Sequence, residues 1–253
     1  MYELTLVNGL ILVGAGIAAG FINTIAGGGS MLTLPALMLM GMPADIANAT
    51  NRVGVVMQSV AGLQGFHKHK RLDTSAMMAI VLPTLLGAAA GAILASWLPA
   101  DILKPVLLGT MIVMALVMVI KPSALSPKEG TQSLSFSEKP SAWLGLFFAG
   151  AYGGFLQAGV GFMLLAAIAG GLRYDLVRAN ALKVFCTFAF SLVALGIFIY
   201  NDLVLWIPGL ILALGSMIGA RLSVNFTVKA SMRTLEWILF AMIVLVCVAA
   251  LFN

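Results

Sequence analysis

Polar residues with the chemistry to bind an anion stand inside an otherwise apolar segment. Asn48, Asn51, Arg52 and Gln58 stand at relative positions i, i+3, i+4 and i+10. This pattern places the four side chains on one face of an α-helix. Amide and guanidinium groups donate hydrogen bonds to oxyanions, and a charged residue facing lipid is costly, so this face is expected to line a cavity or contact other helices.

A second series with the same character occurs later in the chain. Asn180, Lys183 and Thr187 stand at relative positions i, i+3 and i+7. The nine acidic residues lie nearly all at the ends of apolar segments, so neither Arg52 nor Lys183 has an obvious carboxylate partner. We favour the interpretation that both cations attract one anion. The alternative is that each side chain extends to the membrane surface or donates to backbone carbonyl groups.

Three successive glycines interrupt the apolar pattern just before Ser30. Gly27, Gly28 and Gly29 allow positive φ angles and close backbone approach. A helix starting near Ser30 would direct N–H groups and the positive end of its dipole at this break, which suits an anion. A tight helix–helix contact or a plain turn remain alternatives. A phosphate-binding loop is excluded because no Gly-Lys-Ser/Thr follows.

The composition indicates that these residues lie in a membrane protein. Of the 253 residues, 61% are hydrophobic and 9% charged, against about 25% charged in soluble domains. A soluble enzyme or a nucleic-acid-binding protein is therefore excluded, in spite of the net charge of +5. Cys186 and Cys247 lie in apolar runs, and His67 and His69 have no ligands at metal-binding spacing. We expect no metal and no cofactor.

Ten apolar runs provide the elements that position the polar residues. Most reach the roughly 20 residues that a membrane-spanning helix needs. The runs at 31–42 and 160–171 cover only about 18 Å, so they are expected to be broken or re-entrant helices. The ten runs are 6–26, 31–42, 45–66, 75–98, 102–120, 142–158, 160–171, 176–199, 203–222 and 233–252.

The two short runs occupy the same place in each half of the chain, which indicates an internal repeat. Sliding the first half along the second pairs Gly20 with Gly150 and, at the same offset, Asp45 with Asp175. For both aspartates we favour capping of the helix that follows, and a role in proton transfer is the alternative. A nearly identical offset pairs two longer motifs, which are Leu86-Gly87-x-x-x-Gly91-Ala92 and Leu214-Gly215-x-x-x-Gly219-Ala220.

Basic residues of the loops predict the orientation. If both termini lie outside the cell and the chain changes side of the membrane at every run, short runs included, nearly all loop cations lie in the cytoplasm. Each half then contains five segments, so the halves are inverted relative to each other. We predict an all-α, polytopic membrane protein with two inverted-topology repeats of five segments, each with one short broken or re-entrant helix. The first repeat is 1–120, a cytoplasmic connector is 121–141, and the second repeat is 142–253.

The first half resembles the TauE/SafE sulfite exporter family. The resemblance rests on Thr24-x-Ala26-Gly27-Gly28-Gly29-Ser30-x-Leu32-Thr33-x-Pro35, on Gly41-x-Pro43, and on Ala47-Asn48-Ala49-Thr50-Asn51. The second half has Gln157-Ala158-Gly159-Val160-Gly161 where the family is richer in glycine. The resemblance implies an inner-membrane transporter of sulfite, thiosulfate or small organosulfonates. The residues alone indicate an anion transporter with substrate near the membrane midplane.

Together these observations predict export of a small sulfur-containing oxyanion by alternating access, in a multi-pass protein of the cytoplasmic membrane. An anion pore and a non-transporting assembly subunit are the alternatives. An enzyme is not expected, because no nucleophile–base pair stands inside the membrane segments. The expected partners are the anionic substrate and the bilayer, without nucleic acid, and a homo-oligomer is left open. The predicted substrate-binding residues are Asn23, Thr24, Gly27, Gly28, Gly29, Asn48, Asn51, Arg52, Gln58, Gln157, Gly159, Asn180, Lys183 and Thr187.

Overall fold

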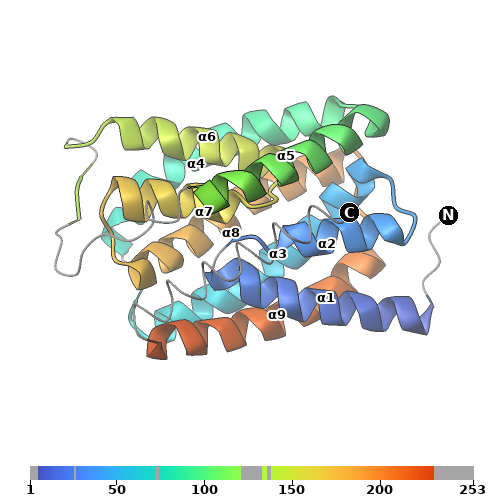
Figure 1. Ribbon diagram of the computed structural model, residues 1–253, viewed down its shortest axis with the longest axis horizontal. Helices are drawn as coiled ribbons and strands as arrows, with labels where there is room; N and C mark the ends of the chain where they lie inside the picture. Colours follow the sequence, from blue (N-terminus) through green and yellow to red (C-terminus); the bar gives the residue numbers. More distant parts are fainter. Residues whose placement is uncertain (1–4, 26, 72–73, 121–132, 136–137, 231–253) are drawn as a thin grey trace.

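The computed structural model describes residues 5–25, 27–71, 74–120, 133–135 and 138–230. All regular structure in these ranges is helical, which confirms the all-α prediction. The helices lie side by side along the long axis of the molecule (Figure 1). The predicted run at 233–252 and most of the predicted connector at 121–141 lie outside the described residues.

The helices of each half follow the predicted runs. Those of the first half are α1 (Leu6–Ile25), α2 (Ser30–Leu39), α3 (Ala44–Lys68), α4 (Thr74–Trp97) and α5 (Ala100–Ile120). Those of the second half are α6 (Ser141–Phe155), α7 (Val160–Leu165), a π-helix (Ala166–Gly171), α8 (Leu176–Tyr200) and α9 (Trp206–Lys229).

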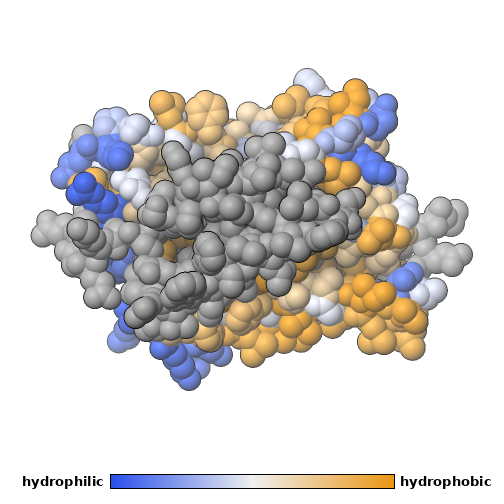
Figure 2. Space-filling model, viewed as in Figure 1, coloured by the Kyte–Doolittle hydropathy of each residue, from blue (hydrophilic) through white to orange (hydrophobic). Residues whose placement is uncertain are grey.

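Four of the described helices are long and apolar enough to cross a membrane: Leu6–Ile25, Met77–Trp97, Leu176–Tyr200 and Trp206–Lys229. Two shorter apolar helices, Ser30–Leu39 and Val160–Gly171, are the predicted short elements. Hydrophilic residues gather at the two ends of the long axis, and apolar residues prevail along the edges between them (Figure 2). This distribution suits a bundle that crosses a bilayer along its long axis.

Glycines bring two pairs of helices into backbone contact. A Cβ at Gly20 of α1 would overlap the backbone of Ser216 in α9. A Cβ at Gly150 of α6 would overlap the backbone of Thr84 in α4 in the same way. Small residues at such crossings allow the close packing that holds helices together in lipid, where the hydrophobic effect does not. The repeated glycines of the sequence are therefore helix-crossing residues.

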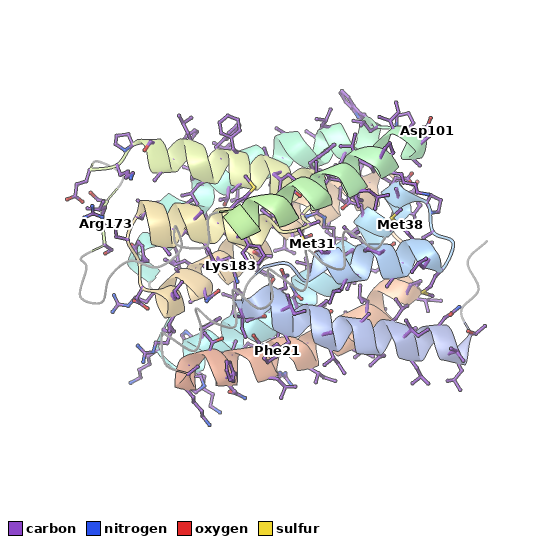
Figure 3. All side chains as sticks on the ribbon, viewed as in Figure 1. Phe21, Met31, Met38, Asp101, Arg173 and Lys183 are labelled. Carbon is purple, nitrogen blue, oxygen red and sulfur yellow. The ribbon has the colours of Figure 1, made fainter. Side chains whose placement is uncertain are left out.

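The packing partners of the two halves correspond. The first helix of each half packs along the fourth helix of the other, α1 on α9 and α6 on α4. The third helix of each half also packs against the fourth helix of the other half, α3 on α9 and α8 on α4. In addition, α3 and α8 contact each other. Arg173 and Asp101 lie at opposite ends of the bundle, as the predicted topology requires (Figure 3). The inversion of the halves in the membrane stays a prediction.

Two local predictions need correction. Helix α9 begins at Trp206 and continues to Lys229, whereas the apolar run suggested 203–222, because a helix can extend past its apolar stretch. Asp175 caps α8 as predicted, accepting from the backbone N–H groups of Val177 and Arg178 at 3.1 and 3.0 Å. Asp45 does not cap α3, since the helix already begins at Ala44 and the residue before it is Pro43.

Candidate anion-binding site

The break between α1 and α2 touches the break between α6 and α7. Gly27 has a φ of +97°, a conformation that glycine adopts without strain. A Cβ at Gly27 would overlap the backbone of Gly161 at the start of α7. The two breaks, which belong to different halves of the chain, therefore meet inside the bundle.

The second break is a tight turn made by non-helical backbone. Gln157 and Gly159 have φ angles of +65° and +77°. The hydroxyl group of Tyr152 donates to the carbonyl oxygen of Ala158 at 2.6 Å and holds the turn. Backbone N–H groups of Gln157, Ala158 and Val160 donate to neighbouring carbonyl oxygens. These three N–H groups are therefore used within the turn in this conformation.

Arg52 is fully buried and binds the end of α6. Its Nη1 donates to the carbonyl oxygen of Gly153 at 2.5 Å, and its Nη2 donates to that of Gly154 at 2.9 Å. The last carbonyl groups of a helix lack intrahelical partners and carry the negative end of its dipole, so a cation is favourable there. The guanidinium group also lies 5.6 Å from the ring centre of Phe198, within range of a cation–π interaction.

Lys183 makes the equivalent contact with the end of α1. Its Nζ donates to the carbonyl oxygens of Asn23 and Thr24 at 3.0 and 2.8 Å, and to Oδ1 of Asn180 at 2.8 Å. An ammonium group has three donors, and all three are used. Lys183 lies in the interior of the bundle, away from both of its ends (Figure 3). Its contacts are therefore complete within the protein.

These contacts change the interpretation of the two cations. The partners of Arg52 and Lys183 in the structure are backbone carbonyl groups, as in the alternative interpretation of the two cations. A carbonyl partner leaves no mark in the sequence, because every residue carries one. Neither cation extends to the membrane surface, since the exposed fractions are 0% and 1%. The charged groups of Arg52 and Lys183 are therefore both buried in this conformation.

Asn51 joins α3 to the first turn of α2. Its Oδ1 accepts from the hydroxyl group of Thr33 at 2.7 Å, and its Nδ2 donates to Oγ of Ser30 at 3.1 Å. Thr24 donates its hydroxyl hydrogen to the carbonyl oxygen of Gly20 in its own helix at 2.8 Å. The polar side chains of the first break thus bind one another or the backbone.

The side of the second break keeps unused hydrogen-bonding atoms. Asn48 donates through Nδ2 to the carbonyl oxygen of Phe155 at 2.8 Å, and Gln157 makes a weak contact of 3.5 Å between Nε2 and Oγ of Ser191. Four of the buried atoms without a partner belong to predicted site residues, which is unusual because such atoms are costly. Among the residues that the structure describes, the buried atoms without a partner are Asp45 Oδ1, Asn48 Oδ1, Arg52 Nε, Gln157 Oε1, Asn180 Nδ2 and Thr227 Oγ1.

Comparison with known proteins identifies the kind of molecule that carries this arrangement. The sequence profile described as sulfite exporter TauE/SafE matches residues 12–250. The chain belongs to the TauE/SafE family. It is 26% identical over 222 residues to a probable membrane transporter protein, ORF9, of Sinorhizobium sp., covering 88% of this chain and 84% of that protein.

Two further relatives agree with the assignment to TauE/SafE. A probable membrane transporter protein of Haemophilus influenzae is 29% identical over 215 residues, which are 84% of this chain and 82% of the relative. The probable membrane transporter protein YfcA of Escherichia coli K12 is 29% identical over 204 residues, 81% of this chain and 75% of YfcA. The chain is therefore a multi-pass membrane transporter of this family.

The remaining predicted residues of this TauE/SafE protein lie inside the bundle or at the start of α2. Asn23, Gln58 and Thr187 are buried. Gly28 and Gly29 accept from the first backbone N–H groups of α2. Within the described parts of the chain no three His, Cys, Asp or Glu side chains come together as metal ligands would. The predicted binding residues do not include Ser30, Thr33 and Ser191, which contact predicted residues. Ser30 and Thr33 belong to the family motif, and Ser191 continues the polar face of Asn180, Lys183 and Thr187.

Proposed function

We propose that this TauE/SafE transporter exports a small sulfur-containing oxyanion, such as sulfite, thiosulfate or sulfoacetate, across the cytoplasmic membrane by alternating access. The substrate would bind where the two helix breaks meet. The family membership supports the transport activity. The choice of an oxyanion rests on the guanidinium group of Arg52.

The observation that supports this proposal most directly is how Arg52 is held. Two parallel N–H groups of its planar fork point at two carbonyl oxygens, those of Gly153 and Gly154. A sulfonate or sulfite group presents two oxygens to such a fork in a comparable way. A substrate oxyanion would replace the two carbonyl oxygens, and the end of α6 would then be released from α3.

Such an exchange would couple binding to movement of the second break. While the carbonyl oxygens occupy the guanidinium group, α6 is tied to α3 and the site is closed. When the substrate occupies the guanidinium group instead, the turn at Gln157–Gly161 is free to change its conformation. Transport needs two states that differ in their contacts with the substrate, and this exchange supplies that difference.

The electrical driving force favours export. A monoanion leaving a cell with a negative interior gains about 2.3 kcal/mol per 100 mV. Export therefore needs no coupling ion. The loop cations, which we place in the cytoplasm together with external termini, would raise the local concentration of the anion on the side from which it leaves.

Flux of labelled sulfite and sulfoacetate through purified protein in liposomes tests the proposal. We expect saturable flux that increases when the compartment containing the anion is made negative, and a loss of at least tenfold in Arg52→Gln. Arg221→Gln is the matched control, because Arg221 is exposed on α9. Flux that does not saturate would indicate an anion pore, and absent flux for every sulfur oxyanion would exclude the proposed substrate class.

A further inference from the structure

The side-chain amide of Asn48 has a fixed orientation. Its Nδ2 donates to the carbonyl oxygen of Phe155 at 2.8 Å, and because a carbonyl group only accepts, the nitrogen of the amide must face it. Oδ1 is therefore the free end. This oxygen is buried and has no partner among the described residues. One of the two N–H groups of Nδ2 is thus used by Phe155, and Oδ1 offers a bound ligand an unpaired acceptor.

Arg52 stands one helical turn after Asn48 on the same face of α3, where side chains four residues apart are neighbours. Its Nη1 and Nη2 donate to Gly153 and Gly154, the residues just before Phe155. Its Nε is a buried donor without a partner in the described part of the chain. An unused donor and an unused acceptor therefore lie on adjacent side chains, and both side chains donate to carbonyl oxygens of the same three residues of α6.

A ligand that satisfies both atoms must accept from Nε of Arg52 and donate to Oδ1 of Asn48. A fully deprotonated oxyanion only accepts, so it would place a negative oxygen against Oδ1 and leave it unpaired, which costs free energy. An oxyanion that carries its own N–H or O–H group satisfies both. Oε1 of Gln157, also buried and unpaired, adds a second acceptor two residues after Phe155.

From this juxtaposition we infer that Asn48 is a specificity-determining residue, which selects oxyanions that carry a hydrogen-bond donor, such as hydrogen sulfite. The inference rests on the proposed function. It places the selective contact on the Arg52 side of the site, where an unpaired donor and an unpaired acceptor stand on adjacent side chains. On the Lys183 side, all donors of the ammonium group are used and the unpaired atom of Asn180 is a donor, Nδ2. A site that rejects ligands unable to complete its buried hydrogen bonds can discriminate strongly.

Sulfamate and methanesulfonate form a matched pair of probes. Both are monoanions of the same shape at neutral pH, and they differ in an NH₂ group in place of a CH₃ group. We expect full-length wild-type protein in detergent to bind sulfamate about tenfold more tightly, as one net hydrogen bond provides. Calorimetric titration measures both affinities. Asn48→Leu should remove this preference by weakening sulfamate binding alone.

Thr227→Val is the control, because Thr227 is also buried with an unpaired oxygen but lies on α9. It should keep the wild-type preference. Equal binding of the two probes by the wild-type protein would overturn the inference, and it is the result expected if a water molecule pairs Nε of Arg52 with Oδ1 of Asn48. The comparison of sulfamate with methanesulfonate on the wild-type protein tests the inference even if Asn48→Leu does not fold. If neither probe, sulfite nor sulfoacetate binds, the proposed substrate class fails as well.

Discussion

Arg52 and Lys183 make the same contact from opposite halves of the chain. Each donates to the last carbonyl groups of the first helix of the other half, Arg52 to α6 and Lys183 to α1. The end of the first helix of each half, just before the break, is therefore held by a cation of the other half. The two cations differ in one respect, since Lys183 has used all its donors and Arg52 has not.

The planar fork of Arg52 should be needed in addition to its charge. Arg52→Lys keeps a positive charge but cannot donate two parallel hydrogen bonds to two oxygens. Loss of one charge-assisted hydrogen bond, about 1.5–3 kcal/mol, predicts at least a tenfold weaker affinity for sulfite. Titration of the purified protein measures this, with Arg221→Lys as the exposed control. Unchanged affinity in Arg52→Lys would mean that a point charge is sufficient.

Lys183 should contribute mainly to stability. Lys183→Met leaves three buried acceptors without a donor, those of Asn23, Thr24 and Asn180. At about 1–3 kcal/mol for each unsatisfied group, we expect a loss of about 3 kcal/mol or more. Unfolding by a denaturing detergent measures the change. Lys229→Met, at the exposed end of α9, should have little effect, and equal stability of the two variants would contradict the prediction.

The crossing of α1 and α9 should not tolerate a methyl group. Gly20→Ala places a Cβ on the backbone of Ser216, so the helices must separate, at a cost of about 1–3 kcal/mol or more. Gly14→Ala on the same helix has no atom within 4 Å of the new Cβ, so it should be neutral or stabilise by up to about 1 kcal/mol. Thermal unfolding in detergent compares the two variants. Similar melting temperatures would show that the crossing is looser than described.

The contact between the two breaks should depend on Gly27. Gly27→Ala combines an unfavourable φ of +97° with overlap on the backbone of Gly161. Gly41→Ala has a similar φ of +88° but open space around the new Cβ, so it isolates the backbone strain, about 1–3 kcal/mol. We expect Gly27→Ala to lose transport and Gly41→Ala to retain most of it. The liposome flux assay makes the comparison, and equal activity would argue against the contact.

The predicted orientation can be tested with single cysteines in a background without Cys186 and Cys247. An impermeant thiol reagent added to intact cells should label Asn201→Cys. It should not label Lys70→Cys or Arg173→Cys, whose loops carry basic residues that we place in the cytoplasm. Labelling of all three after cell disruption is the control. Labelling of Lys70→Cys and Arg173→Cys from opposite sides would rule out the predicted inversion.

The helices could be predicted from the sequence because lipid imposes a simple rule on their length and composition. The short elements α2 and α7 stood out by length alone. The end of α9 could not be predicted in this way, since the helix continues to Lys229 through residues that the hydropathy pattern assigns to a loop. Likewise the backbone of Ala166–Gly171 winds as a π-helix, for which the sequence carries no distinct signal.

For the site, the sequence predicted which side chains are buried but not what they bind. The polar faces of α3 and α8 are turned inward, as the cost of a charge in lipid requires. The partners of Arg52 are carbonyl groups of Gly153 and Gly154, and backbone atoms leave no trace in a pattern of side chains. The repeat did contain a signal, because the offset that pairs the two halves also pairs those two glycines with Asn23 and Thr24.

The pairing of α1 with α9 has a consequence for how the protein is made. About 180 residues separate the end of α1 from the start of α9, so at roughly 5–20 residues per second the ribosome needs on the order of ten to forty seconds to produce the partner. During that interval the glycine-lined face of α1 has no α9 to pack against. The native bundle is therefore completed only late in synthesis, when the ninth helix reaches the first.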